Sequence, residues 1–332
     1  MPLTRPVRTA AAAVTALLLA SPAAAAHDRS GRDVDRHLPL TYVLQPQGAA
    51  DPDIYPEGVA AQGTRFYVGS TTDGTVYRGR LGDPVATPFL PGGQDGRTSA
   101  IGMKVDGRTL FVAGGATGLV FAYDVATGEL TGRWQVTDPG GAPTFLNDLV
   151  VTRRGDVYVT DSQRPVLYRI DARERRTHGL AVLPTFVDFT GTDLQYQPGF
   201  NVNGIAATRD SRHLVLAQSN TGRLFRVATR DGAVTGIDLG GGSVSGDGLV
   251  LDGDTLYAVE RQGDVGYLVT VELDRRLTSG TVLRRTTDPT FDDPTTAAAV
   301  GRGSLLVVNS QFGERAAGEE PDTFTVSRVP AP

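Results

Sequence analysis

Six short apolar segments recur along the chain, and most of them open with a residue that carries a side-chain oxygen. The opening residues are Glu57, Ile101, Asn147, Asn203, Asp247 and Thr296. Successive members of this set are separated by 44, 46, 56, 44 and 49 residues. Carboxylate and amide oxygens are the ligands that hard divalent cations such as Ca²⁺, Mg²⁺ and Mn²⁺ prefer. The set could therefore bind a metal ion if the fold brings its members together.

The segments that follow each opening residue read as strands. Apolar residues alternate with small or polar ones over 65–70, and again over 75–78, and the same pair of patterns recurs after the later openings. Glycine, aspartate and asparagine occupy the junctions, as expected for turns. A repeat of this length is typical of a propeller blade. We therefore predict an all-β fold, a six-bladed β-propeller with four-stranded blades; two stacked β-sandwiches are the alternative.

The predicted propeller occupies residues 40–332 as a single domain. Its last blade ends shortly after the strand at 323–326 and lacks an outer strand of its own. The segment 41–44 has a strand pattern and no partner nearby in the sequence. We expect this N-terminal strand to complete the last blade, which closes the ring and removes an exposed sheet edge.

In a propeller, the six opening residues would meet at one mouth of the central channel. Two carboxylates and two amides would then crowd their oxygens into a narrow space, at a desolvation cost of several kcal/mol. A bound cation would relieve this conflict. A water-filled polar channel without a metal is the alternative that the residues leave open.

Four of the openings carry short motifs. These are Pro56-Glu57-Gly58, Asn147-Asp148, Asn203-Gly204 and Asp247-Gly248, in this order and at blade spacing. With these motifs the chain resembles the SMP-30/gluconolactonase family of six-bladed propellers, many of which hydrolyse lactones with one divalent cation in the channel mouth. The resemblance covers nearly all of the chain that remains after the predicted signal peptide 1–26.

The resemblance implies roles for individual residues. Glu57, Asn203 and Asp247 would be ligands of one divalent cation, with Ca²⁺ preferred and Mg²⁺, Mn²⁺ or Zn²⁺ as alternatives. Asp247 would also be the general base, and Asn147 would face the substrate or complete the metal shell. The full set of expected substrate contacts is Asn147, Asp148, Thr296 and Phe189.

Two features depart from the family pattern. An arginine often precedes the Asn-Asp pair in the family's lactonases, whereas Thr144-Phe145-Leu146 stands here and Ile101 interrupts the polar ring. The longest spacing leaves an extra segment, 184–200, that contains four aromatic residues: Phe186, Phe189, Tyr196 and Phe200. We predict that this segment is a lid with an apolar wall; an insertion packed on the surface is the alternative.

Composition excludes several other chemistries. The chain has no cysteine, which rules out thiol catalysis and iron–sulfur clusters. None of its four histidines opens a blade, and no G-x-S-x-G elbow is present. The glycine-rich run 240–246 lacks the lysine of a phosphate-binding loop and is interpreted as a turn that leads to Asp247. The net charge of −5, without a basic run, argues against nucleic-acid binding.

Residues 1–26 have the pattern of a signal peptide. Arg5 and Arg8 precede an apolar stretch, and Ala24-Ala25-Ala26 forms an A-x-A cleavage site. The apolar stretch is too short for a comfortable membrane span, which needs about 20 residues. We predict a secreted protein with a linker at 27–39, a mature chain without a membrane span, and a monomeric state.

Three functions remain from the sequence. The first is a metal-dependent hydrolase of a lactone or similar cyclic ester, with a small-molecule substrate and a carboxylate base. The second is a non-catalytic propeller, stabilised by a metal, that binds a ligand or an exported protein. The third is a lyase or strictosidine-synthase-like reaction in the same pocket. Fold alone does not choose among them.

Overall fold

The computed structural model describes residues 38–46, 53–137, 141–301 and 303–332. The chain divides into two compact units, Met1–Leu38 and Pro39–Pro332, and the fold below is that of the second unit. The predicted signal peptide 1–26 and all but the last two residues of the predicted linker lie outside the described residues. Among the described residues, no helix is long and apolar enough to cross a membrane.

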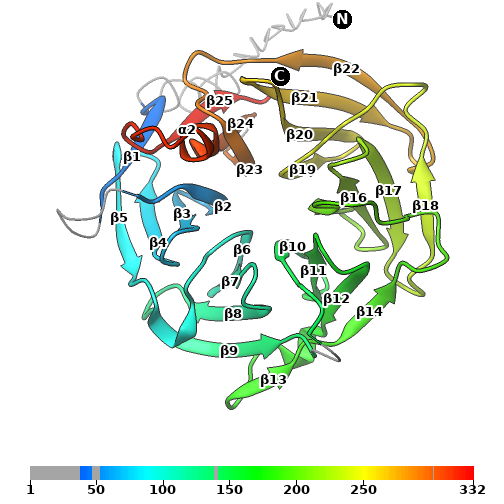
Figure 1. The fold of residues 1–332 in the computed structure, drawn as a ribbon, viewed down its shortest axis with the longest axis horizontal. Coiled ribbons are helices and arrows are strands. Elements are labelled where there is room, and N and C mark those ends of the chain that lie inside the picture. The colour runs from blue at the N-terminus through cyan, green and yellow to red at the C-terminus, as the bar shows by residue number, and fades with distance from the viewer. Residues whose placement is uncertain (1–37, 47–52, 138–140, 302) are drawn as a thin grey trace, which may run out of the picture. The chain divides into compact units, whose positions relative to one another are not determined.

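In the described residues of this unit, the regular secondary structure is mostly β-strand, arranged in five hydrogen-bonded sheets (Figure 1). The largest sheet has the order β2 (Pro56–Gln62), β3 (Arg65–Ser70), β4 (Val76–Arg80), β5 (Val85–Leu90), β1 (Thr41–Leu44), β25 (Thr325–Pro330), β24 (Ser304–Asn309) and β23 (Pro294–Val300). The five-stranded sheet has the order β13 (Leu180–Val182), β9 (Leu130–Gln135), β8 (Leu119–Asp124), β7 (Thr109–Ala113) and β6 (Met103–Asp106).

The other three sheets have four strands each. The first runs β10 (Leu146–Val151), β11 (Val157–Asp161), β12 (Val166–Ile170) and β14 (Thr185–Asp188). The second runs β15 (Val202–Ala207), β16 (His213–Gln218), β17 (Arg223–Ala228) and β18 (Val234–Ile237). The third runs β19 (Leu249–Asp252), β20 (Thr255–Gln262), β21 (Val265–Leu273) and β22 (Gly280–Thr286). Short helices are η1 (Gln94–Gly96), η2 (Ala172–Glu174) and α2 (Phe312–Ala317).

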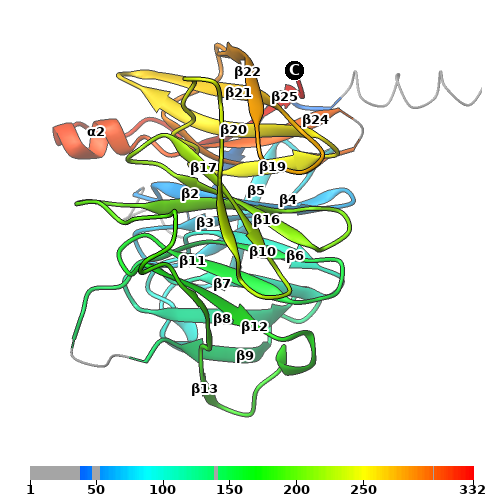
Figure 2. The same ribbon diagram turned by 90° about the vertical axis from the view of Figure 1, so that its right-hand side faces the viewer.

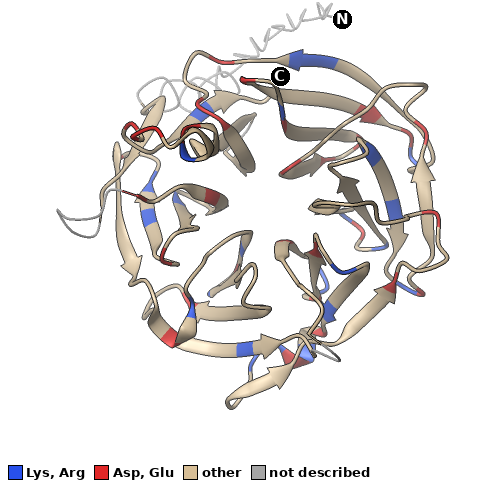
Figure 3. Ribbon diagram, viewed as in Figure 1, with Lys and Arg blue, Asp and Glu red and all other residues tan. Residues whose placement is uncertain are grey.

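The sheets are arranged in a ring about a common centre, as in a β-propeller (Figure 1). Around the centre, β2 contacts β6, β6 contacts β10, and the contacts continue through β15, β19 and β23 back to β2. Each of these inner strands leads to strands farther out in antiparallel pairs. The prediction of an all-β, propeller-like fold therefore agrees with the structure. Figure 3 shows acidic and basic residues interspersed around the ring.

The hydrophobic core lies between neighbouring sheets. One cluster joins Phe111 and Trp134 of one sheet to Leu149, Val159 and Tyr168 of the next. Alternation along each strand sends one set of side chains to each face, so every sheet can cover both of its neighbours. The repeated pattern in the sequence is the direct consequence of this packing.

The strand β1 joins two distant parts of the chain. It pairs antiparallel with β25, with Tyr42 opposite Val326, and parallel with β5, with Val43 opposite Val85. The Tyr42 side chain is fully buried, and its hydroxyl donates a hydrogen bond to the Leu81 carbonyl at 2.9 Å. Both edges of β1 are therefore hydrogen-bonded to a neighbouring strand.

Candidate functional site

Irregular backbone at the start of the inner strands presents the opening residues to the channel. The register shifts within β2 between Pro56 and Val59, within β10 between Leu146 and Leu149, and within β15 between Val202 and Ile205. A bulge of this kind releases its residues from the ladder and can redirect their side chains. Glu57, Asn147 and Asn203 each lie in such a bulge.

The glycine after an opening residue has a packing role. A Cβ on Gly58 would lie 1.9 Å from the Ile101 carbonyl oxygen, and one on Gly204 would lie 2.4 Å from the Asp247 carbonyl oxygen. Neighbouring inner strands thus approach too closely for any side chain at these positions. The Glu-Gly and Asn-Gly motifs therefore combine a polar residue for the channel with a glycine for the contact between blades.

Five of the six opening residues meet at one cavity of about 360 Å³. The sixth, Thr296, does not line it. The residues that line the cavity are Glu57, Thr71, Ser99, Ile101, Phe145, Asn147, Phe200, Asn203, Asp247, Phe312 and Arg315. The two carboxylates and two amides form the polar floor, and Thr71, Ser99 and Arg315 add further polar groups. Ile101 and three phenylalanines supply the apolar part of the lining.

Glu57 has a buried carboxyl group, and one of its oxygens is unpaired in the described part of the chain. Its side chain is 5% exposed, and its Oε2 atom has no hydrogen-bond partner. Burial raises the pKa of Glu57 well above its usual range, and the negative charges of Asp247 and Asp148 raise it further, while Lys104 opposes them. A positive charge in the cavity would stabilise the ionised form of Glu57.

Asp247 lies beside Asn203. It accepts a hydrogen bond from Asn203 Nδ2 to Oδ1 at 2.7 Å. Burial raises the pKa of Asp247 to about 7, and the hydrogen bond from Asn203 opposes this rise. The group keeps part of its surface open to the cavity. A carboxyl that titrates near neutrality and reaches the cavity is suited to accept a proton.

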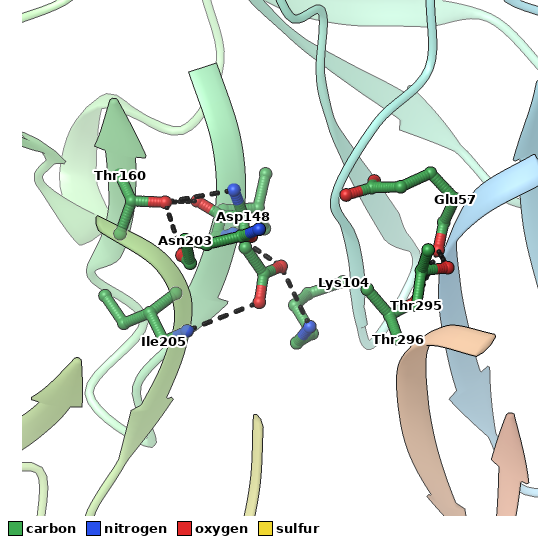
Figure 4. A network of polar contacts seen from close by, with 9 residues as sticks. Glu57, Lys104, Asp148, Thr160, Asn203, Ile205, Thr295 and Thr296 are labelled. Carbon is green, nitrogen blue, oxygen red and sulfur yellow. Dashed lines mark hydrogen bonds and ion pairs between the residues drawn. The ribbon is translucent and has the colours of Figure 1, made fainter. Parts of the chain in front are cut away.

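In Asn147 and Asn203 the side-chain nitrogen is hydrogen-bonded, and the side-chain oxygen is the atom left without a partner in the described part of the chain. Asn147 Nδ2 donates to Ser162 Oγ at 2.9 Å, and Asn203 Nδ2 donates to Asp247. Asn147 Oδ1 and Asn203 Oδ1 are buried and have no partner in the described part of the chain, like Glu57 Oε2. Figure 4 shows Glu57 facing the side on which Asn203 lies.

These unpaired oxygens fit a hard divalent cation. Three buried acceptors without a donor are costly unless an ion or water satisfies them. The described residues contain no cluster of three or more His, Cys, Asp and Glu side chains that could hold a metal. A cation here would therefore depend on the two amide oxygens in addition to Glu57 and Asp247.

Asp148 and Thr296 are not among the residues that line the cavity. Asp148 is 2% exposed, forms an ion pair with Lys104 at 3.2 Å, and accepts a hydrogen bond from the Ile205 amide at 3.4 Å (Figure 4). The Thr296 hydroxyl donates to the Glu57 carbonyl at 2.6 Å. Neither residue lines the cavity, and the expected contact of each with substrate stays a prediction.

Phe189 is also placed away from the cavity. Its ring is 1% exposed and packs in a core with Leu194 and Val202, and it stacks on Tyr196 at 6.1 Å. The expectation that Phe189 lines the pocket is not met. The segment 184–200 begins with β14, a regular strand of its sheet, and only Phe200 of its four aromatic residues reaches the cavity.

Sequence reasoning missed several residues of the cavity. Phe145 was noted only as the neighbour of the Asn-Asp pair, and Phe312 and Arg315 come from α2, a six-residue helix in a polar stretch. Such a helix is too short to show a hydrophobic period. Phe145 and Phe200 pack edge to face at 4.9 Å, and both line the cavity.

No protein-family model and no curated protein matches the sequence. Among solved structures, a gluconolactonase from Xanthomonas campestris is 17% identical, with a TM-score of 0.56 over 82% of this chain and 86% of that one. The calcium-binding protein regucalcin from Agrobacterium tumefaciens is 17% identical, with a TM-score of 0.55 over 85% and 93%. Virginiamycin B lyase from Staphylococcus aureus is 13% identical, with a TM-score of 0.57 over 87% of both chains. Similarity at this level of identity extends to the fold, and the chain shares the β-propeller fold of these proteins.

Proposed function

We propose that this protein is a secreted, divalent-metal-dependent hydrolase of a lactone or similar cyclic ester. The observation that carries the proposal is that Glu57, Asn147 and Asn203 line one cavity with Asp247, and that each of the three has a buried side-chain oxygen without a partner among the described residues. The structural likeness to a gluconolactonase and to a calcium-binding protein supports the choice among reactions that a propeller can host.

Glu57, Asn203 and Asp247 would hold the cation, and Asn147 would complete its shell or orient the substrate. When bound, a divalent cation supplies a Lewis acid that polarises a carbonyl and lowers the pKa of water. Ca²⁺ is the first choice for an all-oxygen ligand set, with Mg²⁺, Mn²⁺ and Zn²⁺ as alternatives.

Residues of the chain would supply the general base, hold it in place and exclude bulk water. Asp247 would accept the proton of the attacking water, and Asn203 would hold its carboxylate in place through the hydrogen bond at 2.7 Å. The phenylalanines at the opening would exclude bulk water from the ester, which strengthens the polar interactions at the floor.

The wider architecture belongs to the same proposal. We infer six four-stranded blades, with β1 as the outer strand of the last blade; the antiparallel pairing of β1 with β25 supports this.

We also infer that residues 1–26 direct export and are removed. The intact mass of protein recovered from culture medium tests the cleavage, and light scattering tests the proposed monomer.

One experiment tests the hydrolase directly. Wild-type protein, Asp247→Asn and Glu57→Gln are compared for Ca²⁺ binding by calorimetry and for hydrolysis of a lactone panel, with Asp252→Asn at an exposed strand end as control. We expect Glu57→Gln to weaken Ca²⁺ binding at least about tenfold. Asp247→Asn should lower kcat by about 10²-fold or more. Full activity in Asp247→Asn would overturn the assignment of the base.

The same panel distinguishes the two other functions. Metal binding without any hydrolysis would favour a ligand-binding propeller, for which the apolar wall of the cavity is equally suited. Elimination products in place of hydrolysis products would favour a lyase, the activity that the name of one structural neighbour carries.

A further inference from the structure

Arg315 introduces a positive charge at the cavity. It is the only basic side chain among the described residues that line the cavity, whose other ionisable members are Glu57 and Asp247. Arg315 belongs to α2, which lies at one face of the ring (Figure 2). In the described part of the chain it takes part in no ion pair. Its charge is therefore available to a ligand.

The guanidinium is held in a defined place. It lies over the ring of Tyr55 at 4.8 Å, and its Nη1 donates to Thr71 Oγ1 at 3.3 Å. The Thr71 hydroxyl in turn donates to the Tyr55 carbonyl at 2.7 Å. Stacking on an aromatic face leaves the edge of the guanidinium free for a bidentate partner.

The segment that carries Arg315 is also anchored. The Gly313 amide donates to Asp293 Oδ2 at 2.7 Å. At its base, Gln311 Oε1 accepts from the Asp322 amide at 2.7 Å and Gln311 Nε2 donates to the Asp322 carbonyl at 3.4 Å. A positive side chain on an anchored segment loses less entropy on binding than one on a free loop.

The neighbouring wall is aromatic. Phe145, Phe200 and Phe312 line the same cavity and come from three separate parts of the chain. Flat apolar groups pack well against such edges and faces. Glu57 lies in β2 and Asp247 just before β19, whereas Arg315 belongs to α2. An anionic group of a substrate would be attracted by the positive charge of Arg315.

We propose that the natural substrate of this site has a flat apolar body bearing a carboxylate, which Arg315 binds while the ester faces Glu57 and Asp247. The assignment of the ester end rests on the proposed hydrolase, whereas the binding of the carboxylate by Arg315 does not. Arginine matches a planar carboxylate with two parallel hydrogen bonds, and such charge-assisted pairs are among the stronger polar contacts.

The binding arm of the test needs no catalysis. Affinities for phenylpropanoate and for the isosteric phenylpropanamide are measured by calorimetry for wild type, Arg315→Gln, Arg315→Lys and the control Arg230→Gln, whose side chain is 91% exposed on the surface. We expect wild type to prefer the carboxylate about tenfold. Arg315→Gln should lose that preference, Arg315→Lys should keep part of it, and the control should keep all of it.

The kinetic arm uses a dihydrocoumarin carboxylate and its carboxamide. Arg315→Gln should lower kcat/KM for the carboxylate about tenfold more than for the carboxamide. Carboxylate-selective binding without hydrolysis would overturn the hydrolase and leave this inference standing. The opposite result is also possible: wild type and Arg315→Gln hydrolyse both compounds with the same ratio of kcat/KM values, and wild type binds the two phenylpropanoid probes equally well. That result would overturn this inference and leave the hydrolase standing.

Discussion

Asn203 and Asp247 open two neighbouring inner strands and are joined by a hydrogen bond of 2.7 Å from the amide nitrogen to the carboxylate. This bond fixes the orientation of both side chains. The amide nitrogen is used, so the amide oxygen remains unpaired, and the carboxylate is stabilised in its charged form against the effect of burial. One contact between blades thus shapes both the candidate ligand set and the candidate base.

The first prediction concerns pH and the metal-free protein. The pKa of Asp247, about 7 in the folded chain, lies above the usual value of about 4 for a free aspartate. The folded state therefore keeps a proton that the unfolded state releases, and the contribution of Asp247 to stability falls as pH rises from about 4 to about 7. We expect the free energy of unfolding in chelator to drop by on the order of 2 kcal/mol over this range.

Urea denaturation at several pH values measures this drop. Asp247→Asn should flatten the pH dependence, although Glu57 will keep part of it because its pKa is also raised. Added Ca²⁺ should stabilise wild type more at the alkaline end than at the acid end, because it competes with protons for the same oxygens. A metal-free stability that rises across this pH range would contradict the prediction.

The second prediction concerns the packing of inner strands. Gly204→Ala would place a Cβ 2.4 Å from the Asp247 carbonyl oxygen, and this backbone atom cannot move without shifting the neighbouring strand. We expect a loss of about 2–3 kcal/mol in unfolding free energy, together with weaker Ca²⁺ binding because Asn203 and Asp247 are displaced. The matched control is Gly236→Ala in β18, where the nearest atom is the Arg223 guanidinium at 3.4 Å.

Chemical denaturation of both variants gives the answer. Equal stability of Gly204→Ala and Gly236→Ala would show that the inner strands tolerate separation, and the packing role of the glycine would be wrong.

The features that the sequence predicts best are those that a local residue pattern determines. Alternation in each strand arises because each sheet covers two neighbours, so the strands and five of the residues at the channel cavity could be found from spacing alone. Thr296 does not line the cavity, and its hydroxyl donates to the Glu57 carbonyl. No local signal specifies the direction of a side chain within a bulge, where one extra residue reverses the face.

The rest of the cavity depends on long-range packing. Phe189 and Phe200 belong to one aromatic segment, yet one packs in a core and the other lines the cavity. Arg315 reaches the site only because Tyr55 and Thr71, more than 240 residues earlier, receive it. Contacts between residues so far apart in the chain leave no period in the sequence.

The third prediction concerns the segment that leads to Asp247. Glu260 is 2% exposed and forms an ion pair with Arg285 at 2.6 Å. Arg285 also donates to the Ser243 carbonyl at 2.6 Å, and the Ser245 amide donates to Glu260 at 3.1 Å. Arg285→Gln leaves a buried carboxylate without its cation, so we expect a loss of about 2 kcal/mol, less than for a fully buried pair because Arg285 is partly exposed.

The same change should also affect the site. Because Ser243 and Ser245 come just before Asp247, Arg285→Gln should weaken Ca²⁺ binding, which calorimetry measures. Arg284→Gln, at the exposed neighbouring position of β22, serves as control and should change neither quantity. If both variants behave alike, the ion pair does not position this segment.

The fourth prediction concerns β1 as the link between β25 and β5. Tyr42 is fully buried, packs edge to face on Phe66 at 4.9 Å, and donates its hydroxyl to Leu81, whereas Val43 on the opposite face of the strand is 36% exposed. Tyr42→Ala should cost about 3–5 kcal/mol, as large-to-small changes of buried aromatic residues do. Val43→Ala should cost no more than about 0.5 kcal/mol.

Urea denaturation of the two variants, with Tyr42→Phe as a third, separates packing from hydrogen bonding. Tyr42→Phe removes only the hydroxyl and should cost about 1 kcal/mol. If β1 were only loosely attached to the ring, Tyr42→Ala and Val43→Ala would have the same small effect, and the inference that this strand completes the last blade would fail. A large cost for Tyr42→Ala alone requires that β1 is part of the cooperative unit, because a residue on a detached strand cannot affect global unfolding.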